Sequence, residues 1–148
     1  MQDQFLARLP KSATSKLTLR VTLEAARSDF PRGAATYREA LAFFVDHGDR
    51  VKVASCLEGL AYLAALDGEP ERAARLLGAA EALYQSAGAG TQLPIHDRTG
   101  HGPAIAAMHA ALDDGAIAAG WASGRALSFD QAIDEARDVA DNLAGIQD

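Results

Sequence analysis

The sequence is poor in cysteine, in basic charge and in long apolar runs, and each shortage excludes a class of protein. Cys56 is the single cysteine among 148 residues, so no disulfide can form within the chain. Acidic residues outnumber basic ones by 20 to 14, which disfavours nucleic-acid binding by this segment because phosphate contacts need clustered Lys and Arg. No apolar run approaches the ~18 residues of a membrane span, and residues 1–10 lack the apolar core of a secretory signal. We therefore expect a cytoplasmic protein with a reduced thiol.

Small aliphatic side chains dominate what the sequence does contain. The chain is 49% hydrophobic but only 6% aromatic, and alanine is its most frequent residue. Alanine has the highest helix propensity, and small side chains let helices pack closely. The composition and length therefore predict one all-α domain with a core of its own.

The chain also matches itself when it is shifted by 40 residues. The matched pairs include Leu17 with Leu57, Leu23 with Leu63, Arg32 with Arg72, Ala40 with Ala80, Phe43 with Leu83 and Gly48 with Gly88. A fixed period of this size is typical of helical repeat arrays, which build scaffolds and binding surfaces. Over 16–24 apolar and polar residues alternate, as in a strand, but the shift aligns this stretch with a clear helix. We therefore predict a helix over 16–28.

The other helices are predicted from apolar stripes at helical spacing and from the stop signals between them. They cover 31–46, 50–66, 70–87, 103–113 and 116–125, and a last helix begins at Ser128. Gly48 is expected to end the first of these helices, and Ser128 with Gln131 has capping-box spacing. The predicted organisation is a tail or lead-in helix over 1–14, two 40-residue repeats over 15–88, a loop over 89–102 and a helical cap over 103–148.

Within 54–85 the chain resembles a tetratricopeptide repeat. The residues that match the small and apolar positions of its two helices are Leu57, Leu60, Ala61 and Ala64, then Ala73, Leu77 and Ala80. The period is longer than the usual ~34 residues, and Gln85 stands where the terminal proline would be, so "tetratricopeptide-like" is the better description. The resemblance implies stacked antiparallel helix pairs, an α-α superhelix, with the C-terminal helices as a cap.

Two longer strings resemble the C-terminal helical-repeat region of LuxR-type and related bacterial transcriptional regulators, which carry a signalling ATPase domain. They are CLEGLAYLAALDGEPERAARLLGAAEALYQSAGA and GWASGRALSFDQAIDEA, the second with Trp121, Gly124, Arg125, Leu127, Ser128 and Ala132 at the expected places. The chain contains no GxxxxGK[ST] phosphate loop and no evident helix-turn-helix, so neither ATP binding nor DNA binding is carried over. The role that the resemblance implies is sensing or protein interaction.

Candidate binding residues lie outside the packing stripes. In tetratricopeptide arrays the first helices line the concave face, which makes Ser55, Glu58 and Tyr62 candidates for a binding groove. Ordinary packing is the favoured alternative for these three residues. Trp121 could stack on a ligand, although a core anchor is the favoured alternative. Arg125 could bind an anion, or it could cap helix carbonyls or pair with an acidic neighbour.

The remaining chemistry-bearing residues do not converge on a reaction. His96, His101 and His109 have a spacing that matches no standard zinc pattern. Cys56 lies in an apolar helical stretch, where a buried and inert thiol is expected. No acid, base and nucleophile come together, so we expect no enzymatic activity, no cofactor and no metal.

The sequence therefore favours a non-catalytic helical-repeat module from a bacterial transcriptional regulator, used for protein–protein interaction or effector sensing. Expected partners are another protein, the chain's own neighbouring domains or a second copy in a homodimer. Two helix pairs are fewer than the three or so repeats that usually stand alone. The C-terminal helices should therefore pack on the last repeat with Trp121 at the joint. The alternative is a small-molecule inducer pocket between repeats and cap, near Tyr62, Trp121 and His101.

Overall fold

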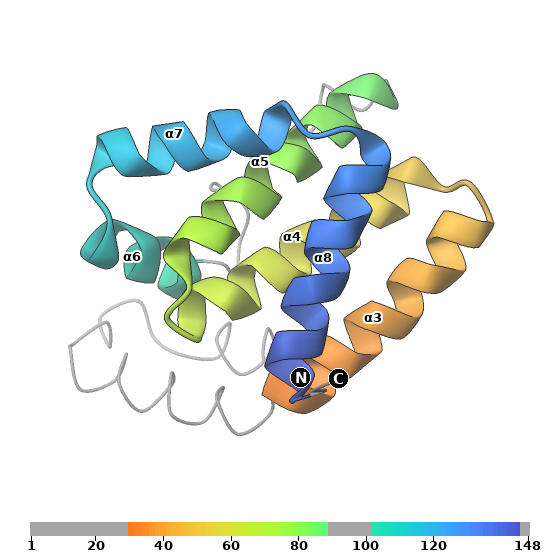
Figure 1. Ribbon diagram of the computed structural model, residues 1–148, viewed down its shortest axis with the longest axis horizontal. Helices are drawn as coiled ribbons and strands as arrows, with labels where there is room; N and C mark the ends of the chain where they lie inside the picture. Colours follow the sequence, from red (N-terminus) through yellow and green to blue (C-terminus); the bar gives the residue numbers. More distant parts are fainter. Residues whose placement is uncertain (1–29, 89–101, 146–148) are drawn as a thin grey trace.

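The computed structural model describes residues 30–88 and 102–145, and these ranges contain helices and no strand. The helices are α3 (Phe30–Asp46), α4 (Arg50–Leu66), α5 (Pro70–Ser86), α6 (Gly102–Ala111), α7 (Asp114–Arg125) and α8 (Phe129–Ala144) (Figure 1). The predicted all-α class is confirmed for the described residues. The tail over 1–14, the helix over 16–28 and nearly all of the loop over 89–102 lie outside them.

A glycine turn follows each of α3, α4 and α5. Gly48, Gly68 and Gly88 have φ angles of 69°, 86° and 78°, a left-handed conformation that glycine takes without steric cost. After the first turn the Asp49 carboxylate accepts the Lys52 backbone N–H at 3.1 Å, which caps the start of α4. The observed bounds of α4 equal the predicted 50–66, and the predicted stop at Gly48 is confirmed.

The core lies around α4 and α5, which pack against each other and against most of the other helices. α4 is buried on nearly all sides because α3, α5, α6 and α8 all contact it. The largest fully buried side chains are Leu41, Val53, Leu57, Leu60, Leu76, Leu77 and Val139. Each leucine removed from water contributes about 1.5–3 kcal/mol, so this aliphatic cluster holds the described helices together.

α8 returns across the molecule and packs along α3 in the opposite direction (Figure 1). Near the end of α8 the Asp141 carboxylate lies 2.6 Å from Arg38 Nε of α3. Near its start the Arg50 guanidinium lies 4.4 Å from the centroid of the Phe129 ring. In an open solenoid each repeat contacts only its neighbours. The contact between α8 and α3 therefore closes the described helices into a bundle, a feature that the repeat period did not predict.

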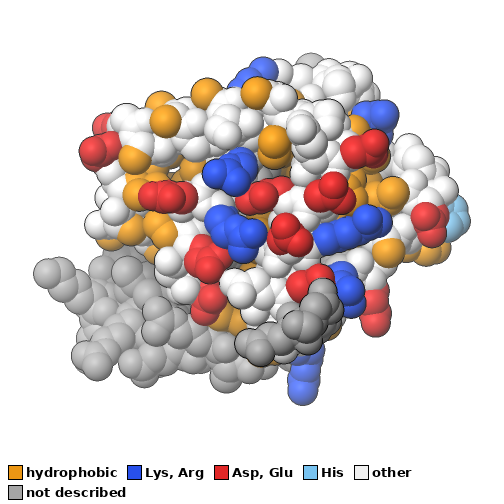
Figure 2. Space-filling model, in the orientation of Figure 1, with side chains coloured by type: hydrophobic (Ala, Val, Ile, Leu, Met, Phe, Trp, Pro, Cys, Tyr) orange, Lys and Arg blue, Asp and Glu red, His pale blue; other side chains and the backbone are white. Residues whose placement is uncertain are grey.

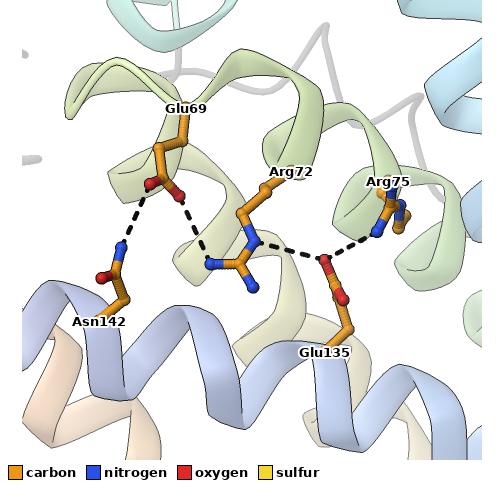
Figure 3. A network of polar contacts seen from close by, with 5 residues as sticks. All are labelled: Glu69, Arg72, Arg75, Glu135 and Asn142. Carbon is orange, nitrogen blue, oxygen red and sulfur yellow. Dashed lines mark hydrogen bonds and ion pairs between the residues drawn. The ribbon is translucent and has the colours of Figure 1, made fainter. Parts of the chain in front are cut away.

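A polar network fastens α8 to the beginning of α5 (Figure 3). Glu135 of α8 lies 3.6 Å from Arg72 Nε and 3.3 Å from an Arg75 Nη nitrogen. Glu69 continues the network to Arg72 and accepts a hydrogen bond from Asn142 at 3.2 Å. Acidic and basic side chains accordingly alternate over this face of the molecule (Figure 2). The Glu135 side chain is only 16% exposed, so water screens its ion pairs less than those of a surface pair.

The start of α8 forms the predicted capping box. Gln131 donates its backbone N–H to Ser128 Oγ at 3.1 Å, and the Ser128 backbone N–H donates to Gln131 Oε1 at 2.9 Å. Two N–H groups that would lack helical partners are thereby satisfied. The capping box fixes where α8 begins.

Candidate functional site

The three predicted groove residues of α4 share one face of that helix. Ser55 is exposed, whereas Glu58 and Tyr62 are only 6% and 5% exposed. Ser55 Oγ lies 3.0 Å from the hydroxyl oxygen of Tyr84 on α5, a residue that sequence reasoning did not select. Ser55, Glu58 and Tyr62 therefore lie on one face of α4, and Ser55 contacts Tyr84 of α5. Of these four side chains, those of Glu58, Tyr62 and Tyr84 are buried.

Trp121 and Arg125 lie apart from that group, on α7. Arg125 forms an ion pair with Glu81 and donates a hydrogen bond to Gln85 Oε1 at 2.8 Å, both residues of α5. Trp121 is half-buried against the core. α5 lies between α4 and α7 (Figure 1), so the five predicted site residues form two separate groups.

Backbone contact between α5 and α7 positions Trp121. A Cβ atom added to Gly78 would lie 2.9 Å from the carbonyl carbon of Trp121, and one on Gly124 would lie 2.7 Å from that of Arg75. Both distances are shorter than van der Waals contact, so a Cβ atom does not fit at either position. The backbones of α5 and α7 approach each other closely because both positions are glycine. The sequence signal is a small residue at every fourth position, Gly120 and Gly124 in α7 and Ala74 and Gly78 in α5. Trp121 lies at this joint through its backbone, and its side chain is half-buried, less than the core anchor that the sequence favoured.

Cys56 is buried in α4, as predicted. Burial raises the pKa of its thiol to about 11, against a smaller opposing effect of Lys52. Desolvation has this effect because it penalises the charged thiolate. At neutral pH Cys56 is therefore a protonated thiol, the form that is a poor nucleophile.

The histidines of the sequence are distributed without a common site in the described part of the chain. His96 and His101 lie outside the described residues. His109 Nδ1 lies 3.7 Å from an Asp114 carboxylate oxygen, and both side chains are exposed. No group of three or more His, Cys, Asp or Glu side chains within 30–88 and 102–145 could hold a metal ion. None of the described helices has the length and apolarity to cross a membrane.

An exposed aromatic cluster stands at the end of α3. Phe43 is 55% exposed and is the one large hydrophobic side chain with this exposure among the described residues. Its ring stacks on His47 with centroids 4.0 Å apart and meets the Phe44 ring edge-on at 5.4 Å. His47 Nδ1 also lies 2.8 Å from the Phe43 carbonyl oxygen, which accepts its hydrogen. We call Phe43, Phe44 and His47 the α3 aromatic patch.

Sequence reasoning did not select Phe43. The 40-residue match pairs it with Leu83, which is buried. The inward stripe of α3 runs through Ala34, Leu41 and the half-buried Phe44, and Phe43 lies about 100° around the helix from Phe44. The sequence signal for an exposed ring was the pair of adjacent phenylalanines, Phe43 and Phe44. One apolar stripe of an amphipathic helix cannot bury two adjacent side chains equally.

Two acidic residues flank the α3 aromatic patch. Glu39 and Asp46 lie four residues before and three residues after Phe43, so all three side chains share one exposed face. The last turn of α3 contains no basic residue.

No protein-family model matches the chain, and no curated protein or solved structure shows a significant match to it.

Proposed function

We propose that this chain is a non-catalytic helical module that binds another protein through the exposed face of α3. The exposed ring of Phe43 is the observation that carries the proposal. Keeping an aromatic ring in water forgoes the free energy of its burial. Aromatic side chains are also enriched among the residues that dominate binding energy at protein interfaces.

The packing beneath Phe43 supports this role. Ala34 and Leu41 of α3 are fully buried, and α4 and α8 both pack on the helix. Arg38 joins α3 to α8 through Asp141. A side chain that is presented on a helix held in this way loses little conformational freedom on binding, and such preorganisation favours affinity.

The proposed biological setting is the helical-repeat region of a bacterial transcriptional regulator. The glycine turns at Gly48 and Gly88 stand 40 residues apart, in agreement with the repeat period, and the two helices between them, α4 and α5, pack as a pair in the tetratricopeptide-like manner that we propose. In that setting the module senses an effector protein or a neighbouring domain of the regulator. A second copy of the chain would also be a protein partner in this sense.

Two designed amphipathic helices of equal length test the proposal, one of leucine and lysine and the other of leucine and glutamate. We expect the chain to bind at least one of them saturably, or else to self-associate in sedimentation experiments. The substitution Phe43→Ser should weaken that interaction about tenfold or more, as loss of an interface anchor does. Ala118→Ser changes an exposed residue of α7 and should leave it unchanged.

The proposal is wrong if the chain binds neither helix and remains a monomer. It is also wrong if Phe43→Ser interacts as tightly as the original chain does. Circular dichroism melts of both variants provide the control, since an exposed side chain should be replaceable with little loss of stability.

A further inference from the structure

The charges beside Phe43 determine which partner its surface fits. Glu39 and Asp46 are exposed on the same face, and neither forms an ion pair with another described residue. The neighbouring arginines are directed elsewhere, Arg38 to Asp141 and Arg50 to the ring of Phe129, while His47 stacks on the Phe43 ring and donates to the Phe43 carbonyl. The exposed ring is therefore flanked by negative charge that is not neutralised within the described residues.

The end of α3 adds to this negative field. The C-terminal carbonyl groups of a helix carry a partial negative charge, for which basic side chains in the last turn are favourable. α3 has no basic residue there and ends at Asp46. His47, just beyond the helix, donates to the Phe43 carbonyl and leaves the other carbonyls of the last turn without a basic side chain.

We infer that the partner segment is basic, an amphipathic helix that places a Lys or Arg beside its apolar anchor. This inference rests on the proposed function and names the chemistry of the partner. A cation at this surface meets the carboxylates of Glu39 and Asp46, the carbonyl end of α3 and the aromatic ring of Phe43, and each of these attracts positive charge.

The same charges argue against a second copy of the chain as the occupant. A two-fold contact centred on Phe43 would place the same patch of both copies together. Glu39 and Asp46 of one copy would then face those of the other, and like charges across an interface are unfavourable.

The experiment measures how tightly the whole chain binds the leucine–lysine helix and its leucine–glutamate counterpart. We expect the lysine helix to bind at least about tenfold more tightly than the glutamate helix, and its affinity should fall as salt is added. The double variant Glu39→Gln with Asp46→Asn should weaken this binding about tenfold while the fold is retained. Its control is the double variant Glu71→Gln with Asp114→Asn. This variant also removes two negative charges, but at the starts of α5 and α7.

The outcomes separate this inference from the proposed function. If the glutamate helix binds equally well or better and depends on Phe43, the inference is overturned and the interaction function stands. If the control pair weakens binding as much as the patch pair does, the net charge of −6 attracts the peptide without a site, and the inference is again overturned. If neither helix binds and the chain does not self-associate, the proposed function itself is wrong.

Discussion

The substitution Gly124→Ala should force α7 away from α5. The added Cβ would lie 2.7 Å from the carbonyl carbon of Arg75 and 3.0 Å from the amide nitrogen of Ala79, and it would also overlap the Arg75 carbonyl oxygen. All of these atoms belong to the backbone of α5, so no change of rotamer relieves the overlap. The two helices must separate along their whole contact, which includes the neighbouring approach of Gly120 to Ala74.

The expected loss is the difference between two opposing effects. Overpacking a close contact costs about 1–3 kcal/mol, and a clash with backbone belongs at the upper end of this range. Alanine recovers up to about 1 kcal/mol through its better helix propensity. We therefore expect Gly124→Ala to lower the free energy of unfolding by roughly 2 kcal/mol, which corresponds to about 4–8 °C in Tm for a chain of this length.

Urea denaturation followed by circular dichroism measures this loss, and Trp121 reports on the joint because it is the only tryptophan. Gly33→Ala is the matched control, since its Cβ would meet only Leu63 Cδ1 at an ordinary 3.5 Å. The control should be unchanged or up to about 1 kcal/mol more stable. Gly78→Ala separates the same pair of helices, so the double variant should lose less than the sum of the single losses. A Gly124→Ala variant as stable as the original chain, or additive losses, would refute the close crossing.

Three further predictions concern single side chains. Trp121→Ala should cost about 1–3 kcal/mol in urea melts, less than the ~3–5 kcal/mol of a fully buried tryptophan, and a loss near zero would remove Trp121 from the joint. Because burial raises the pKa of Cys56 to about 11, the unfolded chain releases this proton first as the pH rises. The stability of the original chain relative to Cys56→Ala should therefore fall by roughly 2–3 kcal/mol as the pH rises from about 9 to 11 and beyond, and a pH-independent difference would contradict this. Glu135→Gln should cost roughly 1–2 kcal/mol and Glu81→Gln less than about 1 kcal/mol, and the reverse order would show that the network of Figure 3 does not fasten α8.

The helices that the structure describes could be predicted closely because their signals are local. The stops at Gly48 and Gly68, the proline at the start of α5 and the capping box at Ser128 each depend on residues within one turn. The 40-residue self-match of the sequence supported the same helix boundaries in both repeats. Observed and predicted ends consequently differ by no more than two residues at any of these helices.

The arrangement of the helices could be predicted less well because it depends on contacts between distant residues. The return of α8 to α3 relies on pairs such as Arg38 with Asp141, which no periodicity reveals. The crossing of α5 and α7 does have a sequence signal in Gly120 and Gly124. That signal is short, and its meaning depends on the small residues of the helix that it meets.

The candidate site could be predicted only in part, and for Tyr62 and Glu58 the structure agrees with the favoured alternative of ordinary packing. Tyr62 and Glu58 were selected for lying outside the packing stripe of one helix, but α4 is surrounded on nearly all sides and both side chains are buried. Phe43 was overlooked because the repeat pairs it with the buried Leu83. α8 packs on α3 without covering Phe43, so equivalent positions of the two repeats have different surroundings.

The central claim is that the exposed face of α3 is a protein-binding surface that selects basic partners. Its most direct test is an NMR titration of the isotope-labelled chain with the leucine–lysine helix, in which backbone amide shifts locate the contact. We expect the largest shift changes over residues 39–47. Largest changes over residues 55–62 of α4, or small changes spread evenly over the acidic surface, would contradict the claim.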